Sequence, residues 1–117
     1  MSLAPLLYIF TLHFIGDFVL QSNWMARNKS KSFIALSAHV LTYTLTLWIG
    51  LFILSIPFLF SLMNGVAHLG VDYHTSKVNS QLYQEEDKYW FFVGVGFDQL
   101  LHICTLTVIY YIVMSKV

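Results

Sequence analysis

The sequence predicts an all-α integral membrane protein, a bundle of four transmembrane helices in one domain over residues 1–117. The chain is 57% hydrophobic and only 10% charged, with a mean hydropathy of +0.67, whereas a soluble domain usually carries about 25% charged residues. Four apolar stretches approach the about 20 residues that a helix needs to cross a bilayer. The net charge is zero, so no basic surface points to nucleic acid as a partner.

The four spans are expected at about residues 3–23, 33–54, 57–73 and 89–114. Residues 33–73 contain no lysine or arginine, but as one helix they would be about 60 Å long, twice the hydrocarbon thickness. Ser55-Ile56-Pro57 marks the break, because serine can cap a helix and proline suits the first helical turn. The second and third spans therefore form a tight hairpin. The polar connection 75–88 is compatible with a short helix whose Val78 and Leu82 face the membrane surface.

The cations set the predicted orientation. Five of the six lie between the first and second spans or between the third and fourth: Arg27, Lys29, Lys31, Lys77 and Lys88. Only Lys116 lies beyond the fourth span. The positive-inside rule therefore places both of these connections in the cytoplasm and both termini outside.

Ionisable residues recur inside the apolar spans at a fixed spacing. A histidine and an aspartate lie four residues apart three times, and a further histidine lies alone in the second span: His13 and Asp17, His68 and Asp72, Asp98 and His102, and His39. A spacing of four places both side chains on one face of a helix. On the predicted topology all seven lie in the cytoplasmic half of the bilayer. Ionisable groups at membrane depth usually face the bundle interior and are functional, so we expect the seven to meet in space.

Two of these pairs also form a short internal repeat. The segments 13–18 and 68–73 both follow H-x-x-x-D-aromatic, with Gly16 or Gly70 between the histidine and the aspartate. Two parallel hairpins related by an axis along the membrane normal would give this pattern, although six positions are too few to prove duplication. The two glycines would let neighbouring helices approach closely.

Imidazole and carboxylate groups at one depth suit a divalent metal, with zinc or manganese favoured and one or two ions accommodated. The candidate ligands are His13, Asp17, His39, His68, Asp72, Asp98 and His102. Within each pair, one residue can bind the metal while the other orients it. A bound metal would activate water and polarise a phosphoryl oxygen, with Asp98 or Asp72 as the catalytic base.

A site at this depth would face the head groups of the inner leaflet. Four basic residues near the same interface are candidates for binding a substrate phosphate: Arg27, Lys29, His74 and Lys77. The enzyme hypothesis is therefore a membrane-bound, metal-dependent hydrolase that acts on a phospholipid or a lipid-linked phosphoester.

Two other classes of function stay open. A proton or metal-ion transporter or channel subunit would also place histidine and aspartate in the membrane, but four short helices would need a homo-oligomer for alternating access. A non-enzymatic module that binds a partner protein would use the pairs as links between helices, each worth about 1 kcal/mol or less. Metal binding is favoured over links alone, because three pairs and His39 share one depth and buried carboxylates need a cation.

A resemblance to a known family rests on four motifs. These are H-F-I-G-D-F-V-L-Q at 13–21, A-H at 38–39, H-L-G-V-D-Y-H at 68–74 and F-D-Q-L-L-H at 97–102. Together they resemble a domain-of-unknown-function family of small bacterial and phage membrane proteins, over nearly the whole chain. The resemblance implies a multi-pass protein of the bacterial inner membrane and implies no activity. In residue types and setting alone, the chain is also similar to bacterial membrane-bound metal-dependent hydrolases.

Overall fold

The computed structural model describes residues 3–116, which are helical apart from short connections and contain no β-strand. The elements are α1 (Leu3–Phe14), the π-helical turn η1 (Ile15–Val19), α2 (Asn23–Asn28), α3 (Phe33–Leu51), the 3₁₀ turn η2 (Phe52–Leu54), α4 (Phe58–Gln84) and α5 (Lys88–Met114). The predicted all-α fold class is therefore confirmed.

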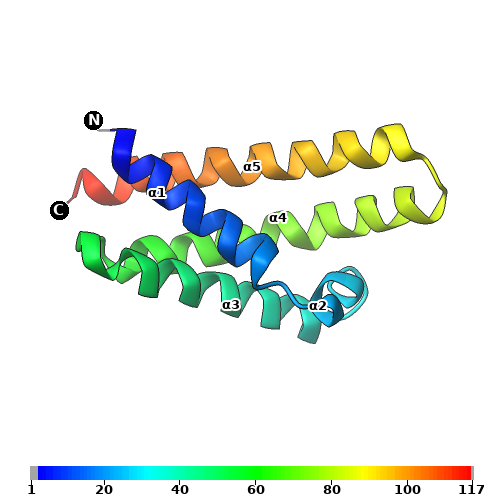
Figure 1. Cartoon of the computed structure of the whole chain (residues 1–117), viewed down its shortest axis with the longest axis horizontal. Coiled ribbons are helices and arrows are strands. Elements are labelled where there is room, and N and C mark those ends of the chain that lie inside the picture. The colour runs from blue at the N-terminus through cyan, green and yellow to red at the C-terminus, as the bar shows by residue number, and fades with distance from the viewer. Residues whose placement is uncertain (1–2, 117) are drawn as a thin grey trace.

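The four long helices run up and down along a bundle that measures 46 × 26 × 20 Å (Figure 1). Both ends of the chain and the turn between α3 and α4 lie at one end of the bundle, which we call the terminal end. The short helix α2 and the turn between α4 and α5 lie at the opposite end, which we call the loop end. This is the order and direction expected for the four predicted segments.

Three of the helices begin after a residue whose side chain holds a free backbone N–H. The side chains of Ser22, Ser32 and Asp87 accept hydrogen bonds from backbone N–H groups in the first turns of α2, α3 and α5. The predicted break between the second and third spans is also present. Ser55, however, ends η2 in the left-handed conformation at φ 56°, and Pro57 sits just before the first turn of α4 rather than within it.

The third predicted segment is longer than expected, because α4 continues without a break to Gln84. Residues 71–84 contain neither glycine nor proline, so nothing in this stretch interrupts the helix. The predicted helix around Val78 and Leu82 is therefore a continuation of α4 and not a separate surface helix. It carries polar side chains beyond the apolar part of the bundle.

By length and composition, two helices in the described part of the chain can cross a membrane: Phe33–Leu54, which joins α3 and η2, and Lys88–Met114, which is α5. Leu3–Val19 is apolar but shorter. The apolar part of α4 carries the polar residues Asn64, His68 and Asp72. Two of the four predicted spans therefore meet this test, and the four-span arrangement stays a prediction.

The bundle interior is divided along its length. At the terminal end it is apolar, with Ile9, Leu47, Phe60 and Leu106 fully buried. Towards the loop end it is polar and contains the histidines and aspartates. Many large apolar side chains lie on the outside instead, among them Ile53, which is 83% exposed.

Close helix contacts depend on glycine at positions that the sequence only partly predicted. A Cβ atom on Gly16 would lie 3.2 Å from the Tyr43 ring, so the predicted close approach is confirmed there. At Gly70 the prediction is wrong, because that residue is exposed and faces open space. Gly65 fulfils this role in α4, where an added Cβ would collide with the Thr44 hydroxyl on α3.

Candidate metal centre

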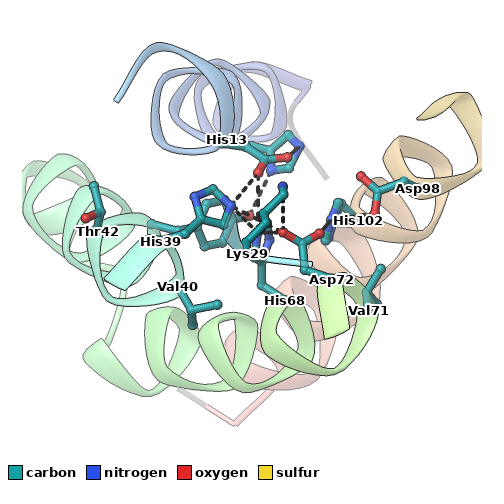
Figure 2. Close-up of polar contacts among 12 residues, drawn as sticks. His13, Lys29, His39, Val40, Thr42, His68, Val71, Asp72, Asp98 and His102 are labelled. Carbon is teal, nitrogen blue, oxygen red and sulfur yellow. Dashed lines mark hydrogen bonds and ion pairs between the residues drawn. The ribbon is translucent and has the colours of Figure 1, made fainter. Parts of the chain in front are cut away.

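The seven ionisable residues predicted to meet form one buried cluster between the four long helices. Their exposure ranges from 0% for His39 to 9% for Asp98. Figure 2 shows the side chains converging from α1 and η1, α3, α4 and α5 towards the middle of the bundle. The expectation that these residues lie together, drawn from their common depth, is confirmed.

Four of the seven form an inner group, in which each offers one atom to a common point: Asp17, His39, His68 and Asp72. The Nε2 atoms of His39 and His68 lie 3.1 Å apart. The Oδ1 atom of Asp17 lies 3.0 Å from the first Nε2 and 3.3 Å from the second. The Oδ2 atom of Asp72 lies 3.3 Å and 3.2 Å from the same two atoms.

These distances match the spacing of ligands around one metal ion. Zinc ligands at about 2.0–2.1 Å in a tetrahedron lie about 3.3–3.4 Å from one another. Adjacent ligands in an octahedron at similar bond lengths are about 3 Å apart. Two nitrogens and two carboxylate oxygens are also a donor set that zinc and manganese accept. The inner group therefore fits a divalent metal in donor type and spacing, once Lys29, whose Nζ lies 3.1 Å from the same Oδ2 of Asp72, turns away from that oxygen.

Each carboxylate of the inner group is held by a second partner through its other oxygen. Gln99 donates its side-chain N–H to Oδ2 of Asp17 at 3.2 Å. Nε2 of His102 lies 3.1 Å from Oδ1 of Asp72. Such outer partners fix the direction of a metal-binding carboxylate. The two histidines of the inner group have no such outer partner, because their Nδ1 atoms form no hydrogen bond with any described residue.

The remaining residues form an outer layer centred on Gln99. Its Oε1 atom lies 2.9 Å from Nε2 of His13, and its N–H also donates to Asp98 at 3.1 Å. Nδ1 of His13 lies 2.9 Å from the hydroxyl of Tyr43. Our prediction named no role for Tyr43, yet it follows His39 by four residues, the same spacing that identified the pairs.

Asp98 and His102 also permit a second grouping. Together with Asp17 they offer three atoms within 4.8 Å of one another. The hydroxyl of Thr75 donates to Asp98 at 2.5 Å, and His102 lies 3.3 Å from the same carboxylate oxygen. The predicted set of seven ligands therefore divides into an inner group of four and an outer layer that contains His13, Asp98 and His102.

Asp17 reaches the centre from an unusual backbone element. It lies in the π-helical turn η1, which continues α1 and is wider than an α-helix. Such turns occur often at functional sites. The neighbouring Gly16 packs against Tyr43, so this turn lies close to α3.

The four predicted phosphate-binding residues lie in two different places. Lys29 points into the cluster, with Nζ 3.1 Å from Oδ2 of Asp72 (Figure 2), and Arg27 borders the cavity beside it. His74 and Lys77 are exposed and instead contact the Tyr73 ring, which does not border this cavity. Their predicted role stays a prediction.

A cavity of about 620 Å³ opens beside the centre at the loop end of the bundle. The three aspartates of the cluster and Gln99 line its inner part: Asp17, Asp72, Asp98 and Gln99. Of these aspartates, Asp98 has the most accessible side chain, at 13% exposed against 4% for Asp17 and 1% for Asp72. A molecule in the cavity therefore has direct access to the cluster.

Comparison with known proteins identifies a family and no activity. The family model described as "Protein of unknown function (DUF3307)" matches residues 5–117. A comparison with curated proteins gave no match, and neither did a comparison with solved structures.

Proposed function

Because this chain belongs to the DUF3307 family, whose function is unknown, we propose a function from its geometry: a membrane-embedded centre that binds a divalent metal and hydrolyses a phosphoester at the bilayer surface. The observation that carries this proposal is a group of four buried donor atoms in which each of the two histidine Nε2 atoms lies 3.0–3.3 Å from the other three. Zinc or manganese suits this donor set best.

The distribution of polarity supports a membrane setting for all four long helices. The three aspartates and four histidines of the cluster are buried, whereas large apolar residues such as Ile34, Ile49 and Phe92 are more than 65% exposed. A water-soluble bundle would have the reverse arrangement. We therefore propose a four-span protein of the bacterial inner membrane, with both termini outside and the cavity at the cytoplasmic face.

The chemistry divides between the metal and the chain. A bound divalent ion supplies an acidified water and stabilises negative charge on a phosphoryl oxygen. Asp98 is placed to accept the proton of the attacking water, because it borders the cavity and lies outside the inner group. The water oxygen forms a new P–O bond as one of its protons passes to Asp98, the P–O bond to the alcohol breaks, and the departing alcohol takes up that proton from Asp98.

Hydrolysis is a better fit than transport because the cavity beside the cluster lies at the loop end, whereas the described interior towards the terminal end is apolar. Between the cluster and the terminal end lie Leu47, Phe60 and Leu106, all fully buried. An ion crossing the bundle would have to pass this apolar layer, in which the described residues offer no charged group. A site that receives a substrate from the loop end and returns its products there needs no such passage.

The test is metal content and phosphoesterase activity of the detergent-purified protein, in the wild type beside His39→Ala and His74→Ala. We expect one or two equivalents of zinc or manganese in the wild type and in His74→Ala, with a sharp loss in His39→Ala. Metal-dependent hydrolysis of an aryl phosphate or a phospholipid should be lost together with the metal in His39→Ala. Failure to bind zinc or manganese would refute the proposal, and bound metal without hydrolysis of any phosphoester would refute its catalytic part.

A further inference from the structure

We infer that the cavity beside the metal centre binds a phosphorylated polyol or sugar, and that the extension of α4 beyond the apolar bundle binds the hydroxyl groups of this ligand. The inference rests on the proposed function, since it names the alcohol part of the phosphoester. It concerns a different set of residues from the metal ligands.

One face of α4 presents a row of uncharged polar side chains to the cavity. Ser76, Asn79, Ser80 and Gln84 follow one another at helical spacing and all line it. None of these side chains forms a hydrogen bond with another residue in the described part of the chain, and Ser76 Oγ is buried without a partner. Hydroxyl and amide groups both donate and accept, so this face matches a ligand that carries several hydroxyls.

The cations at the cavity are placed to bind the phosphate group of the ligand. Arg27 borders it and forms no ion pair within residues 3–116, so its guanidinium is available for a bidentate contact with phosphate. Lys29 lies deeper, beside Asp72. Among the described residues, the carboxylates that line the cavity all belong to the cluster of histidines and aspartates. A cationic head group such as choline would therefore find no separate anionic partner.

The position of the cavity along the bundle agrees with a head-group site. Helix α4 has 27 residues and is about 40 Å long, which is about 10 Å more than the hydrocarbon thickness. This excess corresponds to about the last seven residues of α4, which include Asn79, Ser80 and Gln84 of the cavity lining. The cavity volume of about 620 Å³ lies within the range of about 300–1,000 Å³ that is usual for ligand pockets.

The first experiment measures binding to the metal-loaded, detergent-purified full chain by calorimetry. The probes are inositol 1-phosphate, glycerol 3-phosphate, phosphocholine and inorganic phosphate. We expect the two polyol phosphates to bind at least tenfold more tightly than the other two probes. Nanodiscs that contain phosphatidylinositol or phosphatidylglycerol form the second arm, and tighter binding there than to the free polyol phosphates identifies a lipid as the source.

Two variants one residue apart provide the matched comparison. Ser80→Leu fills the cavity and should abolish the preference for polyol phosphates, whereas Gln81→Leu, on the outer face of α4, should leave it unchanged. Gln84→Leu at the exposed end of the same face replaces Ser80→Leu if that variant fails to retain metal. Arg27→Gln should lower the binding affinity for all four probes to a similar extent.

The outcomes separate this inference from the proposed function. Equal affinity for inorganic phosphate and the polyol phosphates, or a preference that survives both cavity variants, would overturn the inference even if metal binds and an aryl phosphate is hydrolysed. Absence of both metal and hydrolysis would instead overturn the proposed function on which it rests.

Discussion

Replacing His102 with alanine should weaken metal binding without abolishing it. His102 lies 3.1 Å from Oδ1 of Asp72, the oxygen that points away from the inner group. Loss of such an outer partner lowers metal affinity by about 10- to 100-fold, which corresponds to about 1.4–2.8 kcal/mol. His39→Ala removes an atom that lies within 3.3 Å of the three other inner donors. We therefore expect this variant to lose more than 100-fold in metal affinity.

The assay is competition for zinc between the purified protein and a fluorescent chelator, with far-UV circular dichroism to confirm that each variant remains helical. His74→Ala is the matched control, because His74 is exposed and lies outside the cluster. The expected order of affinity is wild type equal to His74→Ala, then His102→Ala, then His39→Ala.

A different order would refute the division into an inner group and an outer layer. If His102→Ala bound zinc as weakly as His39→Ala or more weakly, His102 would itself be a ligand. The metal would then belong to the alternative grouping of Asp17, Asp98 and His102.

Three further predictions concern packing, catalysis and the metal itself. Gly65→Ala should lower the free energy of unfolding by about 1–3 kcal/mol, because the added Cβ meets Thr44. Gly70→Ala should leave the free energy of unfolding unchanged, because Gly70 faces open space. Equal effects of the two substitutions in urea titrations would contradict this packing. Asp98→Asn should reduce phosphoester hydrolysis by about 100-fold or more while zinc content stays at the wild-type level, and undiminished turnover would exclude Asp98 as the base. A chelator should lower the thermal midpoint, since zinc at about 100 times its Kd contributes about 2.7 kcal/mol; an unchanged midpoint in differential scanning fluorimetry would show that the fold binds no metal.

The composition of the cluster could be predicted because it depends on local periodicity and depth. A spacing of four brings His68 and Asp72 to one face of any α-helix, and the topology predicted from the cations gives the pairs one common level along the bundle. Neither step needs knowledge of which helices are neighbours. The turn at Ser55-Ile56-Pro57 was predictable for the same reason, although the two outer residues differ in their exact roles.

The partners of each residue could not be predicted in this way. The closest aspartate to His39 is Asp17, on η1, and the closest to His102 is Asp72, on α4, so these two histidines lie closest to an aspartate of another element. His68, in contrast, lies closest to Asp72 of its own helix, at 3.2 Å. The pairs within one helix are comparable or longer, up to 3.7 Å for His13 and Asp17. The spacing of four alone would therefore have assigned His13 to Asp17 and His68 to Asp72 as orienting partners. The structure instead places Gln99 and His102 in these roles.

The sequence by itself determined the helical class, the direction of the segments, and the identity and common depth of the ionisable residues. These properties depend on hydropathy and on residues close together in the chain. Only the tertiary structure decided that four donor atoms form an inner group, that Gln99 and Tyr43 belong to its outer layer, and that the α4 extension lines a cavity. Such features depend on the rotation and approach of helices that are distant in the sequence, which close packing of side chains determines.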